Sequence, residues 1–177
     1  MVKFFGTAIL FLVAVLSVHR VQAETPSAAR ADKLETLELT VSTYTDSGPG
    51  SLRAALEQAS EPGQAYRIGF GTAEDTFKVP RVIELTSPLP VIQTTVEIDG
   101  FIPGLLWKAY GATVSGNEQF RVFEVASGGE LRLTGITVEK GRADLGGGVL
   151  NRGRLVIEGV TLLNNHATEA GGAIANQ

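Results

Sequence analysis

The sequence contains no cysteine, so disulfide bonds, thiol catalysis and cysteine-based metal sites are all excluded. Histidine is nearly as scarce, because only His19 and His166 are present. His19 falls in an N-terminal leader, which leaves His166 as the single histidine of the remaining chain. We assign no catalytic role to this one side chain.

Basic residues are neither numerous nor clustered. The chain has 15 Lys and Arg residues against 19 Asp and Glu residues, for a net charge of −4, and these charges are scattered along its length. A nucleic acid or an anionic lipid surface requires a concentrated basic patch. We therefore expect no nucleic-acid partner.

The first 23 residues have the composition of a secretory signal. Lys3 gives a positive start, Phe4–Val18 is apolar, and Val21 and Ala23 are small residues at the positions that a signal peptidase recognises. The apolar stretch is shorter than the roughly 20 residues that span a bilayer. We expect cleavage after Ala23, and no integral membrane segment thereafter.

The most regular feature is a repeat at the C-terminal end, whose two units begin at Gly129 and Gly153. A unit this short cannot bury both faces of its own strands, so it has to stack on copies of itself. Apolar and polar residues alternate within it as in strands, which predicts a β-solenoid. Glycine blocks at Gly146 and Gly171 match with one extra residue. The pairs 24 positions apart are Leu131/Leu155, Leu133/Ile157, Gly135/Gly159, Ile136/Val160, Thr137/Thr161, Val138/Leu162 and Ala143/Ala167.

Upstream of the repeat, short strand-like runs alternate with turn sequences. Their close spacing leaves little room for helical crossovers and favours an all-β array. One segment differs, because Ser51–Ser60 carries an apolar stripe at helical spacing after Ser51, a residue suited to capping a helix. We expect this helix to cover the interior of the first coil. The expected strands are Leu37–Thr45, Arg67–Phe70, Arg81–Leu85, Thr95–Ile98, Thr113–Ser115 and Val122–Val125.

The second repeat unit ends where the first turned into a new strand. A last coil of this kind leaves apolar side chains open to water beside an unpaired strand edge. We therefore expect the chain to continue in missing coils or to be covered by another chain, and truncation is the preferred interpretation. The side chains in question are Leu155, Ile157, Val160 and Ile174.

Three stretches resemble the bacterial secreted right-handed β-helix proteins related to the CSLREA-domain group. They are "DSGPGSLRAALEQA" from Asp46, "VEIDG" from Val96 and "VFEVASGGELRLTGITV" from Val122, although Gly50 stands in place of the cysteine that names the group. The last coil is similar to repeats of the chlamydial polymorphic outer-membrane proteins, with "GGAI" at Gly171–Ile174. This resemblance implies a right-handed parallel β-helix at the cell surface or secreted.

Asparagines recur near the glycine blocks and could be read as a row of ligands. We expect a structural role instead, because asparagine tolerates left-handed backbone and stacks into hydrogen-bonded ladders. The glycine blocks are not followed by Lys-Thr or Lys-Ser, so they do not form a phosphate loop, and turns with positive φ explain them. The asparagines are Asn151, Asn164, Asn165 and Asn176.

An enzyme on this fold would need clustered carboxylates, either for calcium or as an acid and base pair. No acidic column persists from one repeat unit to the next, and Asp99 before Gly100 is typical of a turn. The sequence therefore predicts no catalytic residue, no metal site and no cofactor. The polar pairs one period apart are Glu130/Arg154, Arg142/His166, Asp144/Thr168 and Thr134/Glu158.

These observations predict a signal peptide at 1–23, a disordered leader at 24–36, and the cap and first coils of a right-handed parallel β-helix at 37–177. We expect a non-catalytic exported segment, for adhesion or as a structural scaffold, whose partner is a carbohydrate or a cell-surface protein. Trp107 and Tyr110, in a loop leaving the coil, are the candidate contact residues. One alternative is the N-terminal part of a polysaccharide lyase or glycoside hydrolase with catalytic coils beyond residue 177. A nonfunctional gene remnant is the other.

Overall fold

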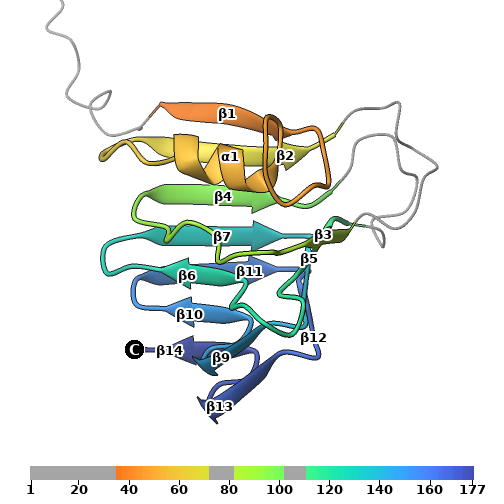
Figure 1. Cartoon of the computed structure of the whole chain (residues 1–177). Coiled ribbons are helices and arrows are strands. Elements are labelled where there is room, and N and C mark those ends of the chain that lie inside the picture. The colour runs from red at the N-terminus through yellow and green to blue at the C-terminus, as the bar shows by residue number, and fades with distance from the viewer. Residues whose placement is uncertain (1–34, 72–81, 102–110) are drawn as a thin grey trace, which may run out of the picture. The chain divides into compact units, whose positions relative to one another are not determined.

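The computed structural model describes residues 35–71, 82–101 and 111–177. They wind into a parallel β-solenoid, which confirms the all-β expectation. Its principal sheet has 5 strands, each stacked in parallel on the one before (Figure 1). These strands are β1 (Thr36–Val41), β2 (Ala65–Phe70), β4 (Thr95–Asp99), β7 (Glu130–Thr134) and β11 (Arg154–Glu158).

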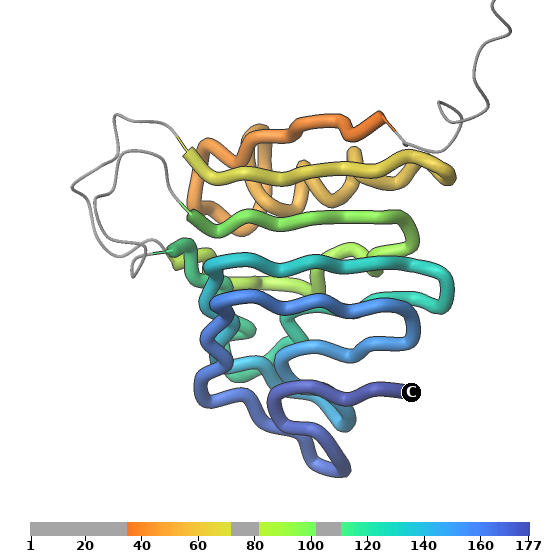
Figure 2. Tube along the Cα trace, turned by 180° about the vertical axis from the view of Figure 1, so that it is seen from behind, coloured from red at the N-terminus to blue at the C-terminus, as the bar shows by residue number. Residues whose placement is uncertain are grey.

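Shorter parallel strands line the other sides of the coil, and Figure 2 shows the successive turns as a continuous winding. One short sheet has 4 strands, another has 3 and the last has 2. The first contains β3 (Val82–Glu84), β5 (Thr113–Ser115), β8 (Thr137–Glu139) and β12 (Thr161–Leu163). The others contain β6 (Phe123–Val125), β10 (Val149–Asn151) and β14 (Ile174–Asn176), and β9 (Arg142–Leu145) and β13 (His166–Ala170).

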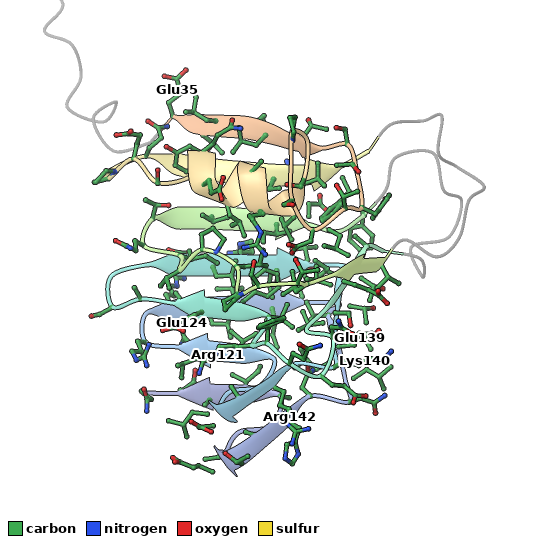
Figure 3. The ribbon with its side chains drawn as sticks, viewed as in Figure 1. Glu35, Arg121, Glu124, Glu139, Lys140 and Arg142 are labelled. Atoms are coloured by element: carbon green, nitrogen blue, oxygen red, sulfur yellow. The ribbon has the colours of Figure 1, made fainter. Side chains whose placement is uncertain are left out.

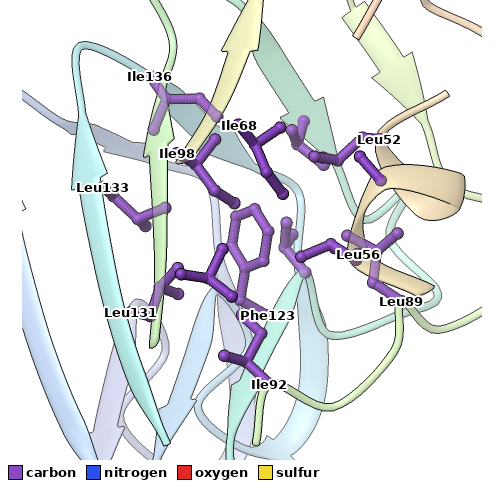
Figure 4. Packing of buried hydrophobic residues seen from close by; sticks show 14 of the residues in the cluster. Leu52, Leu56, Ile68, Leu89, Ile92, Ile98, Phe123, Leu131, Leu133 and Ile136 are labelled. Carbon is purple, nitrogen blue, oxygen red and sulfur yellow. The ribbon is translucent and has the colours of Figure 1, made fainter. Parts of the chain in front are cut away.

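The first turn carries a helix, α1 (Leu52–Gln58), where later turns carry short strands. Its N-cap is Ser51, as the sequence predicts, because the Ser51 hydroxyl accepts a hydrogen bond from the Ala54 amide at 3.2 Å. Leu52 and Leu56 are buried and point towards the centre of the core (Figure 4). The predicted helix and its apolar stripe are therefore confirmed.

The core is a set of aliphatic columns that run from coil to coil around Phe123 (Figure 4). Within the principal sheet, Ile98 and Leu133 are neighbours in register, and both are fully buried. Ile157 continues the same column on β11, yet 45% of it is exposed. The expected open last coil is therefore present: its side chains lack the coverage that the same positions receive one turn earlier.

The strand register confirms the 24-residue period and shows where the extra residue goes. Leu131 lies beside Leu155, and Ala143 lies beside Ala167. A β-bulge follows in β13, after which Ala170 pairs with Leu145. A bulge inserts one residue without disturbing the strands on either side. It thereby explains the offset between the two glycine blocks.

The glycine blocks depart from the expectation in part. Gly146 and Gly171 have positive φ, 58° and 67°, as predicted for turns. Gly147 is needed for a different reason, because a Cβ there would lie 2.1 Å from the His166 carbonyl oxygen. The segments that follow the blocks are the strands β10 and β14 rather than turns, since each finds a parallel partner on the neighbouring coil.

Two predicted boundaries also differ. β1 begins at Thr36, inside the predicted leader, and ends at Val41 rather than at Thr45. It ends there because the Ser42 and Thr43 amides turn to bond the carbonyl oxygen of Gly50, at 2.9 and 3.2 Å. The remaining strands lie close to their predicted ranges.

Candidate functional site

Trp107 and Tyr110, the candidate contact residues, lie outside the described residues. The same is true of the predicted signal peptide and of nearly all of the leader. The role of each therefore stays a prediction, and the candidate site is built from the described coils.

The densest charged group on the described coils is a cluster of Arg121, Glu124 and Arg152. Figure 3 shows Arg121 and Glu124 close together near β6 and β10. One carboxylate oxygen of Glu124 accepts a hydrogen bond from Arg121, and the other accepts one from Arg152. Glu124 and Arg152 belong to neighbouring coils, so this cluster ties one turn of the solenoid to the next.

Arg121 makes a second set of contacts across the coils. Its Nε donates to the carbonyl oxygens of Leu145 and Gly146, both at 3.2 Å, and Nη2 donates to that of Leu145 at 3.0 Å. A guanidinium offers five N–H donors in a fixed plane, which suits it to bridge several acceptors at once. Arg121 therefore holds the corner before β10 in place.

Beside this cluster lies an open hollow of about 380 Å³. Phe120 contributes an aromatic ring and Asp144 a carboxylate, whose Oδ1 accepts a hydrogen bond from the Thr168 hydroxyl at 2.9 Å. An aromatic ring next to polar groups suits a sugar or a polar peptide segment. The carboxylate of Glu124 is already bonded to two guanidinium groups, so the cluster is arranged for binding rather than for proton transfer.

A second charged group lies on the outer face of the principal sheet. Arg67 Nη2 lies 2.9 Å from Asp99 Oδ2, and Arg67 Nε lies 3.7 Å from Glu97 Oε1. The hydrogen bond to Asp99, followed by the charge of Glu97, raises the pKa of the Arg67 guanidinium above its ordinary value. Asp99 Oδ1 also accepts from the Phe101 amide at 3.1 Å, which agrees with the turn role predicted for Asp99.

The asparagines are structural, as expected. Asn151 donates to the Asn176 side chain at 3.0 Å, which forms a ladder between the last two coils. Asn165 accepts from the Gly141 amide at 2.8 Å and donates to a backbone carbonyl one coil away. Asn164 has a φ of 53°, in the left-handed region that asparagine tolerates.

The sequence reasoning missed the Arg121–Glu124–Arg152 cluster. It compared positions 24 apart, which correctly pairs Glu130 with Arg154 and Arg142 with His166. The coils of β6 and β10 are instead offset by 26 residues, since Phe123 pairs with Val149. A single fixed period therefore could not bring Glu124 and Arg152 together.

In the described segments, no three His, Asp or Glu side chains are grouped so as to hold a metal ion. No helix in these segments has the length and apolar character required to cross a membrane. Comparisons with protein-family models, with curated proteins and with solved structures found no match to this chain.

Proposed function

We propose that this chain is a non-catalytic β-helix scaffold of a secreted or cell-surface protein. The observation that carries the proposal is the use made of charged side chains on the outside of the coils. Arg67 bonds to Asp99, Arg152 to Glu124, and Arg154 to Glu130, and in each case the partner belongs to a neighbouring coil. Carboxylates used to join coils act as mechanical links, which is what a stacked rod requires.

The scaffold winds in the right-handed sense, and α1 caps its first coil. The handedness follows from the resemblance to secreted β-helix proteins. Leu52 and Leu56 support the capping role, because both are buried against the residues of the first coils. The residue between them on this face that points into the turn is Ala55, which is also buried.

Its binding role is contact with a carbohydrate or a cell-surface protein. Two places support such contact: the hollow beside Phe120 and Asp144, and the segment that holds Trp107 and Tyr110. The signal sequence at 1–23 directs export.

The enzymatic alternative is tested by incubating the purified protein with pectin and alginate panels, with and without calcium. The proposal predicts no release of unsaturated or reducing ends under any condition. A rate above that of a heat-denatured sample would overturn it.

Export is tested at the cleavage position. Signal peptidase requires a small residue before the cut, so Ala23→Arg should leave an unprocessed chain, whereas Ala23→Ser should be processed. N-terminal sequencing of the protein recovered outside the cytoplasm should begin at Glu24. Identical processing of the two variants, or an unprocessed wild type, would contradict the assignment.

A further inference from the structure

Exposed large apolar side chains gather at the two ends of the described solenoid. Leu37 on β1 is 45% exposed, and at the opposite end Ile157 on β11 and Leu163 on β12 are 45% and 46% exposed. β1 and β11 are the outermost strands of the principal sheet, so within the described residues each has one unpaired edge (Figure 1). Such edges are templates for a further strand.

The backbone groups at the β11 edge point outwards in a regular pattern. The Arg154 amide donates to the Gly129 carbonyl at 2.9 Å, and the Glu158 carbonyl accepts from Gly135 at 3.0 Å, so both residues bond towards β7. Successive residues of a parallel strand bond to opposite neighbours. The amides and carbonyls of Leu155 and Ile157 therefore point towards the free edge.

The β1 edge carries the complementary set. The Val41 carbonyl accepts from Gly71 at 3.2 Å, which directs Val41 towards β2. By the same alternation, Thr36, Glu38 and Thr40 direct their amides and carbonyls away from β2, towards the other free edge. A parallel pair requires this arrangement, in which a residue on one strand bonds to the two residues that flank its partner.

The side chains also match when β1 of a second copy continues the stack below β11. The inward columns of the sheet begin with Leu37 and Leu39 on β1 and end with Leu155 and Ile157 on β11. In the same register, Leu155 meets Leu37 of the next copy and Ile157 meets Leu39. The aliphatic core would then continue from one copy into the next.

Charge complementarity favours the same register. Within the sheet, Arg67 faces Glu97 and reaches diagonally to Asp99, two residues further along the following strand, at 2.9 Å. In the proposed pair, Arg154 faces Thr36 and has Glu38 of the next copy in that diagonal position. The side chain of Arg154 is 68% exposed and extends from the end strand, so it can reach this carboxylate.

We propose that copies of this protein associate head to tail, with the β1 edge of one copy pairing in parallel with the β11 edge of the next. This interface joins two different surfaces, so each added copy presents a new free edge. Its assembly therefore grows with concentration instead of stopping at a dimer. This inference does not depend on the binding role proposed above.

Cysteine cross-linking tests the register, and the absence of native cysteine gives a clean background. Glu158 and Thr40 would be direct neighbours across the interface, with Cα atoms about 4.8 Å apart, within disulfide range. Mixing the Glu158→Cys and Thr40→Cys proteins under oxidation should give a covalent dimer. Thr134→Cys, one coil before Glu158 on the same face, should not cross-link to Thr40→Cys. No cross-link in the first mixture, or equal dimer formation by Glu158→Cys alone, would overturn the proposal.

Charge reversal tests the pairing in solution. In sedimentation experiments, the average mass should rise with concentration beyond that of a dimer. Arg154→Glu should weaken association by about threefold to tenfold, and adding Glu38→Arg to the same chain should restore it. Lys140→Glu, an equal charge change at a corner away from both edges, should have no effect. A mass that stays at monomer or stops at dimer contradicts the proposal, as does a double variant that associates no better than Arg154→Glu.

Discussion

At the scale of single residues, the solenoid depends on backbone that passes too closely for side chains. A Cβ on Gly147 would lie 2.1 Å from the His166 carbonyl oxygen and 2.8 Å from that of Gly172. These atoms belong to backbone on the adjoining coil, which cannot move aside as a flexible side chain would. Gly69 in β2 is different, because a Cβ there has no neighbour within 4 Å and its backbone is extended.

Gly147→Ala should therefore lower the free energy of unfolding by roughly 1–3 kcal/mol, as overpacking of a fixed backbone does. Gly69→Ala is the matched control and should change stability by less than about 0.5 kcal/mol or raise it slightly. Urea unfolding followed by circular dichroism measures both. Equal losses in the two variants would show that close coil contact is not the reason for Gly147.

The sequence predicted the role of several single residues but not all of them. Ser51 as a helix cap and Asn164 in left-handed backbone follow from residue preference alone, and both were predicted correctly. The need for Gly147 could not be predicted in this way. It arises from the neighbouring coil, whose position depends on the whole winding.

At the scale of elements, α1 is fixed to the second turn by one arginine. Arg53 donates to the Pro88 carbonyl at 2.6 Å and the Ser87 carbonyl at 2.8 Å, and it pairs with Asp46 at 2.7 Å. The Thr86 hydroxyl donates to the other oxygen of Asp46. The Arg53 and Asp46 side chains are only 13% and 9% exposed, so this contact is shielded from water.

Arg53→Met keeps most of the apolar stem but removes these bonds and leaves the Asp46 charge without its partner. We expect a loss of roughly 2–4 kcal/mol in unfolding free energy. Glu57→Gln, on the exposed side of the same helix, should cost less than about 0.5 kcal/mol. Urea midpoints with unchanged m-values measure the difference. A loss below 1 kcal/mol for Arg53→Met would mean that this contact does not secure the helix.

Elements in the two regular coils were predictable because their patterns repeat. The earlier coils are less regular: Thr95 and Glu130 are register partners although 35 residues separate them. Long excursions between strands conceal the period there, so the Arg121–Glu124–Arg152 cluster was not predicted. β10 and β14 were missed for another reason, since their flanking glycines are equally typical of turns.

At the scale of the whole molecule, the described coils share one aliphatic interior that each turn extends. Arginine–carboxylate bonds on the outside reinforce the same stacking, as between Arg154 and Glu130 at 3.6 Å. The solenoid was predictable from a repeat of two units, because no other arrangement buries them. The ligand was not, since Trp107 and Tyr110 lie outside the described residues.

Methyl–methyl nuclear Overhauser measurements on protein labelled at Leu, Val and Ile test the stacking most directly. Val96, Leu131 and Leu155 occupy one column on three successive strands. Neighbouring strands lie about 4.8 Å apart, so cross-peaks should join Val96 to Leu131 and Leu131 to Leu155. Val96 and Leu155, two strands apart, should show none. A missing cross-peak between Leu131 and Leu155, or a strong one between Val96 and Leu155, would contradict the winding.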